Sequence, residues 1–183
     1  MTTFGRTYDY RSGMVTTRPG FALTYGYVEF EVDHPVGQGV WPALWLLPTS
    51  GAWPPELDVL EVVGHEPETA YFNVHHPWDG RSREPDGTEL TDAPAAAVID
   101  GLSDGFHRFG LDWRPDRLDW YVDGVLHHSD TDASRIPDEP MYLVMTLSTG
   151  GEWAGPPDAS TPLPASLLVD SVKVWHPADA PPG

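Results

Sequence analysis

The sequence predicts an all-β domain, a β-sandwich or jelly roll, from three observations. Short segments alternate apolar and polar residues, as half-buried strands do. Pro and Gly are frequent, with 20 and 18 among 183 residues, and they fall between these segments, where the chain must turn. No segment keeps apolar residues at helical spacing over several turns. Residues 1–183 have the length of one domain, and no linker divides them.

The clearest alternation comes early in the chain. Val28, Phe30 and Val32 fall on one face of an extended segment, with Glu29 and Glu31 between them on the other face. Because successive side chains of a strand point to opposite faces, this segment predicts a strand with one buried side.

A β-hairpin is predicted where Asp123-Gly124 separates the apolar runs 118–122 and 125–126. Asp-Gly suits a type I′ turn, which needs positive φ at both central residues. Further strands are expected at residues 141–147 and 167–174, and loops at residues 76–91 and 150–164.

The charge balance excludes several classes of partner. The chain has 28 acidic residues against 10 Lys and Arg, so its formal net charge is −18. Such a surface repels phosphate backbones and anionic lipids, which excludes nucleic acid and membranes as expected partners. No apolar run approaches the ~20 residues of a membrane helix, and the first residues lack the pattern of a secretory signal. There is no Cys, hence no disulfide.

The most informative segment places Glu56, Asp58 and Glu61 among apolar residues directly after Pro54-Pro55. Two structural interpretations need no chemistry. The prolines and acids could open a helix, since both suit its first turn. Alternatively, the acids could be the solvated face of a strand.

A third interpretation makes the same carboxylates a catalytic set. In a regular strand Glu56 and Asp58 share a face, and Glu61 points the other way. One extra residue in a β-bulge would rotate Glu61 back to them. Three crowded carboxylates cannot all ionise cheaply, so one would have a raised pKa and could act as an acid.

Several motifs occur in a fixed order around this cluster. They lie at residues 12–17, 25–30, 39–48, 56–61, 106–107, 112–113, 120–124, 150–153 and 168–170. In this order the chain resembles glycoside hydrolase family 16, the laminarinase-like enzymes, over about residues 12–176. Residues 56–61 match the longer, bulged form of that family's signature.

The resemblance implies a curved, concanavalin-like jelly-roll β-sandwich with an open cleft. It implies a retaining endo-hydrolase of a β-linked polysaccharide that works outside the cell and needs no cofactor for catalysis. Carried over to this chain, Glu56 would be the nucleophile, Glu61 the general acid/base and Asp58 the assisting residue.

Aromatic side chains supply the candidates for substrate binding, because sugars have apolar ring faces. The expected binding residues are Trp41, Trp45, Trp53, His75, Trp78 and Trp153. Trp45 is ambiguous, since strand alternation groups it with Trp41 but its leucine neighbours indicate burial. His75 matches a family histidine on a cleft strand. Trp113, Trp120 and Trp175 lie among strand apolars and are expected in the core.

The N-terminal end of the chain is shorter than in most members of the family. Only eleven residues precede Ser12, so the family's N-terminal strands are expected to be shortened or missing. We expect a monomer unless another chain completes this end. Many relatives hold a structural calcium ion, for which Asp170 would be the matching ligand here.

The charges of residues near the expected cleft indicate which polysaccharides it favours. Glu31 and Asp33 stand where relatives often have basic residues, and Thr146 where they often have Asn. A cleft this acidic disfavours sulfated galactans and favours a neutral β-1,3- or β-1,3-1,4-glucan, with agarose as an alternative. Two other functions stay open: a lectin-like polysaccharide-binding module, and an assembly domain that pairs through its open edge.

Overall fold

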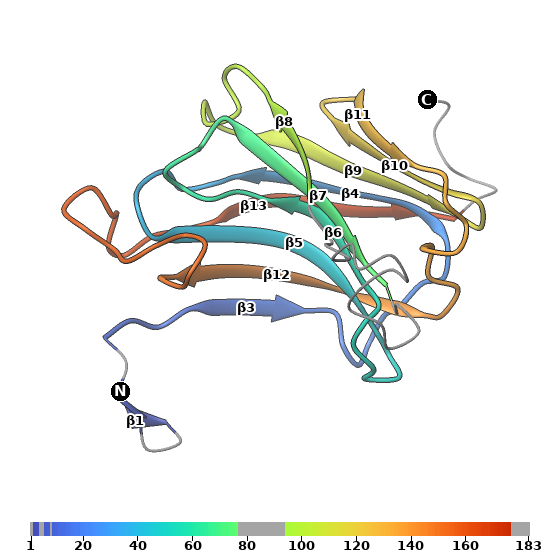
Figure 1. The fold of residues 1–183 in the computed structure, drawn as a ribbon, viewed down its shortest axis with the longest axis horizontal. Helices are drawn as coiled ribbons and strands as arrows, with labels where there is room; N and C mark the ends of the chain where they lie inside the picture. Colours follow the sequence, from blue (N-terminus) through green and yellow to red (C-terminus); the bar gives the residue numbers. More distant parts are fainter. Residues whose placement is uncertain (1, 4–5, 8, 77–93, 177–183) are drawn as a thin grey trace, which may run out of the picture.

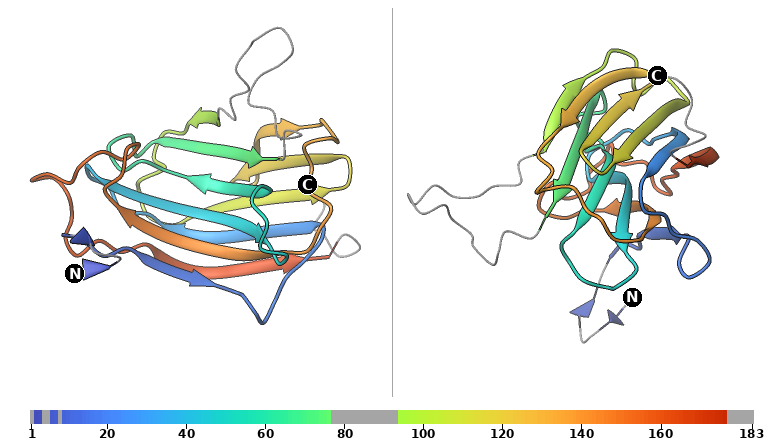
Figure 2. Two further views of the ribbon diagram at one scale, coloured as in Figure 1. Left: turned by 60° about the horizontal axis from the view of Figure 1, so that its bottom comes forward. Right: turned by 90° about the vertical axis from the view of Figure 1, so that its right-hand side faces the viewer.

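Two antiparallel sheets packed face to face form the domain (Figures 1 and 2). This computed structural model describes residues 2–3, 6–7, 9–76 and 94–176, and these residues contain no helix. The strands are β1 (Thr2–Thr3), β2 (Arg6–Thr7), β3 (Gly13–Thr16), β4 (Gly26–Asp33), β5 (Val40–Pro48), β6 (Glu56–Glu61), β7 (Thr69–His75), β8 (Ala95–Val98), β9 (His107–Arg114), β10 (Arg117–Val122), β11 (Val125–Asp130), β12 (Met141–Thr149) and β13 (Leu168–Trp175).

The order of the strands places β6 in the middle of one sheet. Six strands pair in the order β3-β12-β5-β6-β7-β8, and five in the order β11-β10-β9-β4-β13, while β1 and β2 pair only with each other. Strands β5 and β12 bend along their length, and the strands of the two layers run in similar directions (Figures 1 and 2). The predicted all-β, curved jelly-roll sandwich is confirmed.

Local sequence signals predicted strand β4 and the β10–β11 hairpin correctly. Val28, Phe30 and Val32 in β4 are fully buried, as their alternation predicted. The predicted hairpin joins β10 and β11, and both turn residues have positive φ, 50° at Asp123 and 79° at Gly124. The alternation and the Asp-Gly turn are local properties, which explains why the sequence alone revealed them.

The core lies between the two sheets and contains two of the three tryptophans that we expected there. Trp113 and Trp120 are fully buried. The prediction for Trp175 is wrong, because this residue is only half-buried. It pairs with Tyr27 on the polar face of β4, and the two ring centroids lie 5.5 Å apart. An apolar side chain near the end of an edge strand can therefore pack against the outside of the sheet.

The sandwich is open along one side. All four residues of β3, the edge strand of the six-stranded sheet, are exposed. A groove of about 460 Å³ lies between β3, β12 and residues 163–169, and its apolar lining includes Met14, Val15, Leu163 and Val169. Among the described residues, no strand covers this edge. Their fold also offers no helix with the length and hydrophobicity needed to cross a bilayer.

Candidate active site

The acidic segment forms strand β6 and contains a bulge. Asp58 lies opposite Asn73 of β7, and Glu61 lies opposite Tyr71, so two residues of β6 face one residue of β7. The extra residue turns Glu61 to the face that carries Asp58, and the predicted bulge is confirmed. The helix interpretation is wrong because the segment is a strand. The solvated-strand interpretation is wrong because Asp58 and Glu61 are only 2% and 8% exposed.

Apolar side chains explain why this acidic segment lies in the middle of a sheet. Leu57, Val59 and Leu60 are almost fully buried and belong to the core between the sheets. Their burial outweighs the strand-disfavouring acids, so the acids are held on the opposite face. Hydrophobic packing thus fixes the position of the carboxylates.

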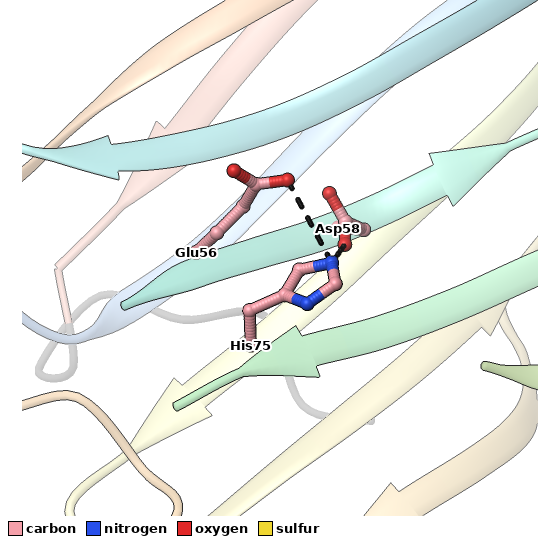
Figure 3. A group of neighbouring side chains, drawn as sticks. All are labelled: Glu56, Asp58 and His75. Atoms are coloured by element: carbon pink, nitrogen blue, oxygen red, sulfur yellow. Dashed lines mark ion pairs between the residues drawn. The ribbon is translucent and has the colours of Figure 1, made fainter. Parts of the chain in front are cut away.

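Glu56, Asp58 and His75 converge at the start of β6 (Figure 3). The Nε2 atom of His75 lies 3.5 Å from Oδ2 of Asp58 and 3.9 Å from Oε1 of Glu56. The side-chain amide of Asn73 lies 3.1 Å from the same Nε2 atom. His75 therefore lies beside two of the three carboxylates, and its role in substrate binding stays a prediction.

The same three side chains are of types that bind metal ions. One ligand atom from each of Glu56, Asp58 and His75 lies within 4.8 Å of the others. Two carboxylates and an imidazole suit a divalent cation such as Zn²⁺. The group also suits proton chemistry, because close carboxylates change one another's pKa.

Burial raises the pKa values of two of the carboxyl groups. The pKa of Asp58 lies well above its usual value because the group is desolvated, and the charges of Glu61 and Glu56 add to this effect. Desolvation also raises the pKa of Glu61, to about 7, against the opposing effect of a hydrogen bond from Trp41. At neutral pH, Glu61 can therefore both donate and accept a proton.

Two predicted tryptophans bind the glutamates directly. Nε1 of Trp41 donates to Oε1 of Glu61 at 3.1 Å, and Nε1 of Trp53 donates to Oε2 of Glu56 at 2.8 Å. Trp53 is 65% exposed, so most of its ring is open to a ligand. Each glutamate is thus held by an indole that borders the site.

The other predicted tryptophans have different positions. Trp153 packs edge-on against Trp41, with centroids 5.3 Å apart, and against Tyr71, with centroids 4.9 Å apart. Trp45 is half-buried, and its Nε1 donates to Thr146 at 3.3 Å. Trp78 lies outside the described residues. Trp153 therefore belongs to the Glu61 end of the site.

A groove of about 280 Å³ adjoins Glu56. Its lining includes Trp45 and Trp53, which we predicted, and also Arg18 and Tyr142, which we did not. The guanidinium carbon of Arg18 lies 5.4 Å from the centroid of the Tyr142 ring. Nothing in the local sequence marks these two residues, because Arg18 lies in the turn after β3 and Tyr142 lies in β12, far away along the chain.

Two residues of β7 were also missed, although a signal for them existed. Tyr71 and Asn73 precede His75 at intervals of two, so all three share the face that carries the site. Alternation counted back from His75 would have found both.

Asp170 lies apart from the acidic cluster. It is exposed in β13, at a register shift between Val169 and Ser171. Within the described part of the chain, the one close group of three acidic or histidine side chains does not include Asp170. The role of Asp170 in holding calcium stays a prediction.

Sequence comparison places the chain among known hydrolases. Residues 3–162 match the profile of the glycosyl hydrolases family 16. An endo-1,3-1,4-beta-glycanase of Rhizobium meliloti (strain 1021) is 43% identical over 176 residues, which cover 92% of this chain and 35% of that protein. A second endo-1,3-1,4-beta-glycanase of the same organism is 38% identical, with 92% and 34% covered. The chain spans about a third of the length of these relatives.

Structural comparison agrees with the sequence match. The catalytic domain of an endo-1,3-beta-glucanase (laminarinase) from Thermotoga petrophila RKU-1 superposes with a TM-score of 0.82 at 31% identity. The superposition covers 96% of this chain and 73% of that one. On the profile match, the identities and the shared fold, this chain belongs to the glycosyl hydrolases family 16.

Proposed function

We propose that this domain hydrolyses internal bonds of a neutral β-1,3- or β-1,3-1,4-glucan with retention of configuration. The observation that carries the proposal is the placement of Glu56 and Glu61 on one face of β6, with the pKa of Glu61 raised to about 7. A retaining glycosidase needs one carboxylate as nucleophile and one carboxylic acid as proton donor. The activities of the relatives, an endo-1,3-1,4-beta-glycanase and an endo-1,3-beta-glucanase, support the same reaction.

The reaction follows from these two groups. Glu56 attacks the anomeric carbon while protonated Glu61 donates its proton to the leaving oxygen, which forms a glycosyl-enzyme ester. Glu61, now a base, removes a proton from water, and the water displaces Glu56. Asp58 is buried beside Glu56, and desolvation raises its pKa, which favours the protonated form that can donate a hydrogen bond to Glu56. Carboxyl groups and water complete the cycle without a cofactor.

The tryptophans suggest where the sugars lie. The exposed ring of Trp53 and the groove next to Glu56 suit sugar on one side of the cleaved bond. Trp41 and Trp153 suit sugar on the side of Glu61. The net charge of −18 favours an uncharged polymer. A neutral β-galactan such as agarose remains the alternative substrate, and because such polymers do not cross membranes, we place the enzyme outside the cell.

An assay for newly formed reducing ends tests the proposed hydrolysis. Wild type, Glu56→Gln and the control Glu31→Gln are incubated with laminarin, lichenan, agarose, carrageenan and xyloglucan. Glu31 lies in β4 of the other sheet, where it pairs with Lys173, so the expectation that Glu31 and Asp33 make the cleft acidic is wrong. We expect wild type and Glu31→Gln to release reducing ends from laminarin or lichenan, and Glu56→Gln to release none. Full activity of Glu56→Gln would contradict the catalytic assignment.

A binding module would behave differently. It would retain the polysaccharide without new reducing ends, and replacing Glu61 would leave the retention unchanged. The raised pKa of Glu61 favours the hydrolase, because binding a neutral sugar needs no proton donor. For the assembly alternative, light scattering after size exclusion gives the mass, and we expect a monomer.

The calcium hypothesis needs its own measurement. If Asp170 helps to hold calcium, then calcium should raise the melting temperature of wild type and leave that of Asp170→Asn unchanged. An equal response of both proteins would remove Asp170 from the hypothesis.

A further inference from the structure

The bulge in β6 is attached to the opposite sheet by a tryptophan. Trp120 belongs to β10, in the five-stranded sheet, and its side chain is fully buried. Its Nε1 atom donates a hydrogen bond of 2.8 Å to the backbone oxygen of Asp58, in the six-stranded sheet. The contact therefore crosses the core and ends at a residue of the acidic cluster.

This hydrogen bond is unusual for a central strand. Strand carbonyls normally lie in the plane of their sheet and pair with the neighbouring strand. Directly after Asp58 both ladders are interrupted, because the register shifts toward β5 between Leu44 and Trp45 and toward β7 between Asp58 and Glu61. A bulge leaves backbone groups without their ladder partners, and a buried carbonyl without a partner is costly. The indole of Trp120 supplies the donor.

We infer that Trp120 is a positioning residue for the hydrolysis proposed above: its bond to the Asp58 carbonyl holds the bulge in the form that directs Glu61 into the site. The inference rests on the proposed function for its catalytic meaning. The claim that this hydrogen bond stabilises the bulge does not depend on the proposed function. Without the bulge, side-chain alternation would turn Glu61 toward the core, so an interaction that stabilises the bulged form also fixes the direction of Glu61.

The surroundings of Trp120 allow the hydrogen bond to be tested apart from the packing. Its ring lies 5.2 Å from His128 and 6.4 Å from Phe72, centroid to centroid, beside a cavity of about 150 Å³. A smaller or equal ring therefore fits at this position. Replacement by 3-(3-benzothienyl)alanine keeps the shape of the indole and puts sulfur in place of the N–H group.

Trp113 provides a matched control. It is also fully buried and lies in β9, in the same sheet. Its Nε1 donates to a backbone oxygen too, that of Pro137, at 3.0 Å. Trp113→Phe therefore removes the same kind of bond from the same sheet, and the bond that it removes ends on Pro137 and not on β6.

The experiment compares Trp120→Phe, Trp120→3-(3-benzothienyl)alanine and Trp113→Phe with wild type. Initial rates over a range of pH are measured on the glucan that wild type cleaves, and melting temperatures are recorded. For both Trp120 variants we expect kcat to fall roughly 10- to 100-fold, because a small misplacement of a catalytic group has this effect, while KM changes less. Trp113→Phe should keep kcat even where it lowers the melting temperature.

A second readout needs no substrate. The side-chain carboxyl ¹³C signal of Glu61 is titrated in all four proteins. Around this group lie Glu56 and Asp58 on β6, Trp41 on β5 and Tyr71 on β7. If the bulge relaxes and Glu61 becomes more solvated, its pKa should fall from about 7 toward 4.5 in the Trp120 variants only.

The possible results distinguish the positioning role of Trp120 from the proposed hydrolysis. Normal kcat and normal Glu61 titration in the benzothienyl variant would overturn the inference, even if Trp120→Phe were impaired, because packing rather than the N–H group would then be responsible. A wild type that cleaves none of the glucans would contradict the proposed function. A Glu61 titration that changes only in the Trp120 variants would still support the positioning role in that case.

Discussion

The indole nitrogen of Trp41 lies 3.1 Å from Oε1 of Glu61, so the proposed acid of the reaction accepts a hydrogen bond from the neighbouring strand β5. Two opposing effects act on this carboxyl group. Desolvation raises its pKa, and the bond from Trp41 lowers it, with a result of about 7. The pair Trp41–Glu61 thus sets the pH at which Glu61 can exchange a proton.

Trp41→Phe should move the alkaline limb of the pH profile upward. The substitution removes the interaction that lowers the pKa of Glu61, while the desolvation remains. Since the general acid must be protonated to act, activity should persist to a pH higher by about one unit. The measurement is kcat/KM against pH. Trp175→Phe, on the outer face of the other sheet, is the control, and a limb that moves downward in Trp41→Phe would contradict the argument.

Glu61→Gln should stabilise the protein at high pH. The pKa of Glu61 is about 7 in the folded protein and 4.5 ordinarily, so its stabilising contribution is complete below pH 4.5 and is lost as the pH rises through 7. At pH 8 the free energy of unfolding of Glu61→Gln should exceed that of wild type by up to roughly 3 kcal/mol. Urea unfolding at pH 4 and pH 8 measures the difference in the free energy of unfolding between Glu61→Gln and wild type. An equal difference at both pH values would contradict the raised pKa of Glu61.

Trp53→Phe should impair turnover without affecting the fold. The indole of Trp53 is largely exposed and donates to Oε2 of Glu56. Its loss removes a group that orients the proposed nucleophile, so kcat/KM should fall by roughly tenfold. The free energy of unfolding should change by less than about 0.5 kcal/mol, as for other surface positions. Val125→Ala, at an exposed hairpin position, should change neither quantity, and unchanged kcat/KM in Trp53→Phe would remove this residue from the site.

Gly110→Ala should destabilise the sandwich. A Cβ atom at Gly110 would overlap the hydroxyl group of Tyr27 and lie 2.6 Å from its Cζ atom, because the Tyr27 ring crosses the sheet over this glycine. Displacing the ring should lower the free energy of unfolding by about 1–3 kcal/mol. Gly13→Ala is the control, since nothing lies within 4 Å of the added carbon there. A Gly110→Ala protein as stable as wild type in urea would show that Tyr27 moves freely.

The sequence revealed features that depend on neighbours along the chain. Alternation in β4 and the Asp123-Gly124 turn depend on local geometry, and both were predicted correctly. The spacing of Glu56, Asp58 and Glu61 also indicated that only a bulge could bring the three carboxylates to one face. The match of ordered motifs to one family then extended these local signals to the whole fold.

The tertiary structure decided the features that depend on partners far away in the sequence. Residues 56–61 form a bulged strand and neither a helix nor a solvated strand, because Leu57, Val59 and Leu60 are buried between the sheets. The tertiary structure also placed Trp175 outside the core.

By itself, then, the sequence determined several of the strands, the hairpin turn and which acidic residues are candidates for the site, since side-chain alternation and turn conformation are properties of adjacent residues. Only the tertiary structure decided which donors hold that set. Trp41 binds Glu61 from β5, and Trp120 binds the Asp58 carbonyl from the opposite sheet, 62 residues away. The pKa of Glu61 follows from this folding as well, because burial produces the shift and burial exists only once the two sheets have packed together.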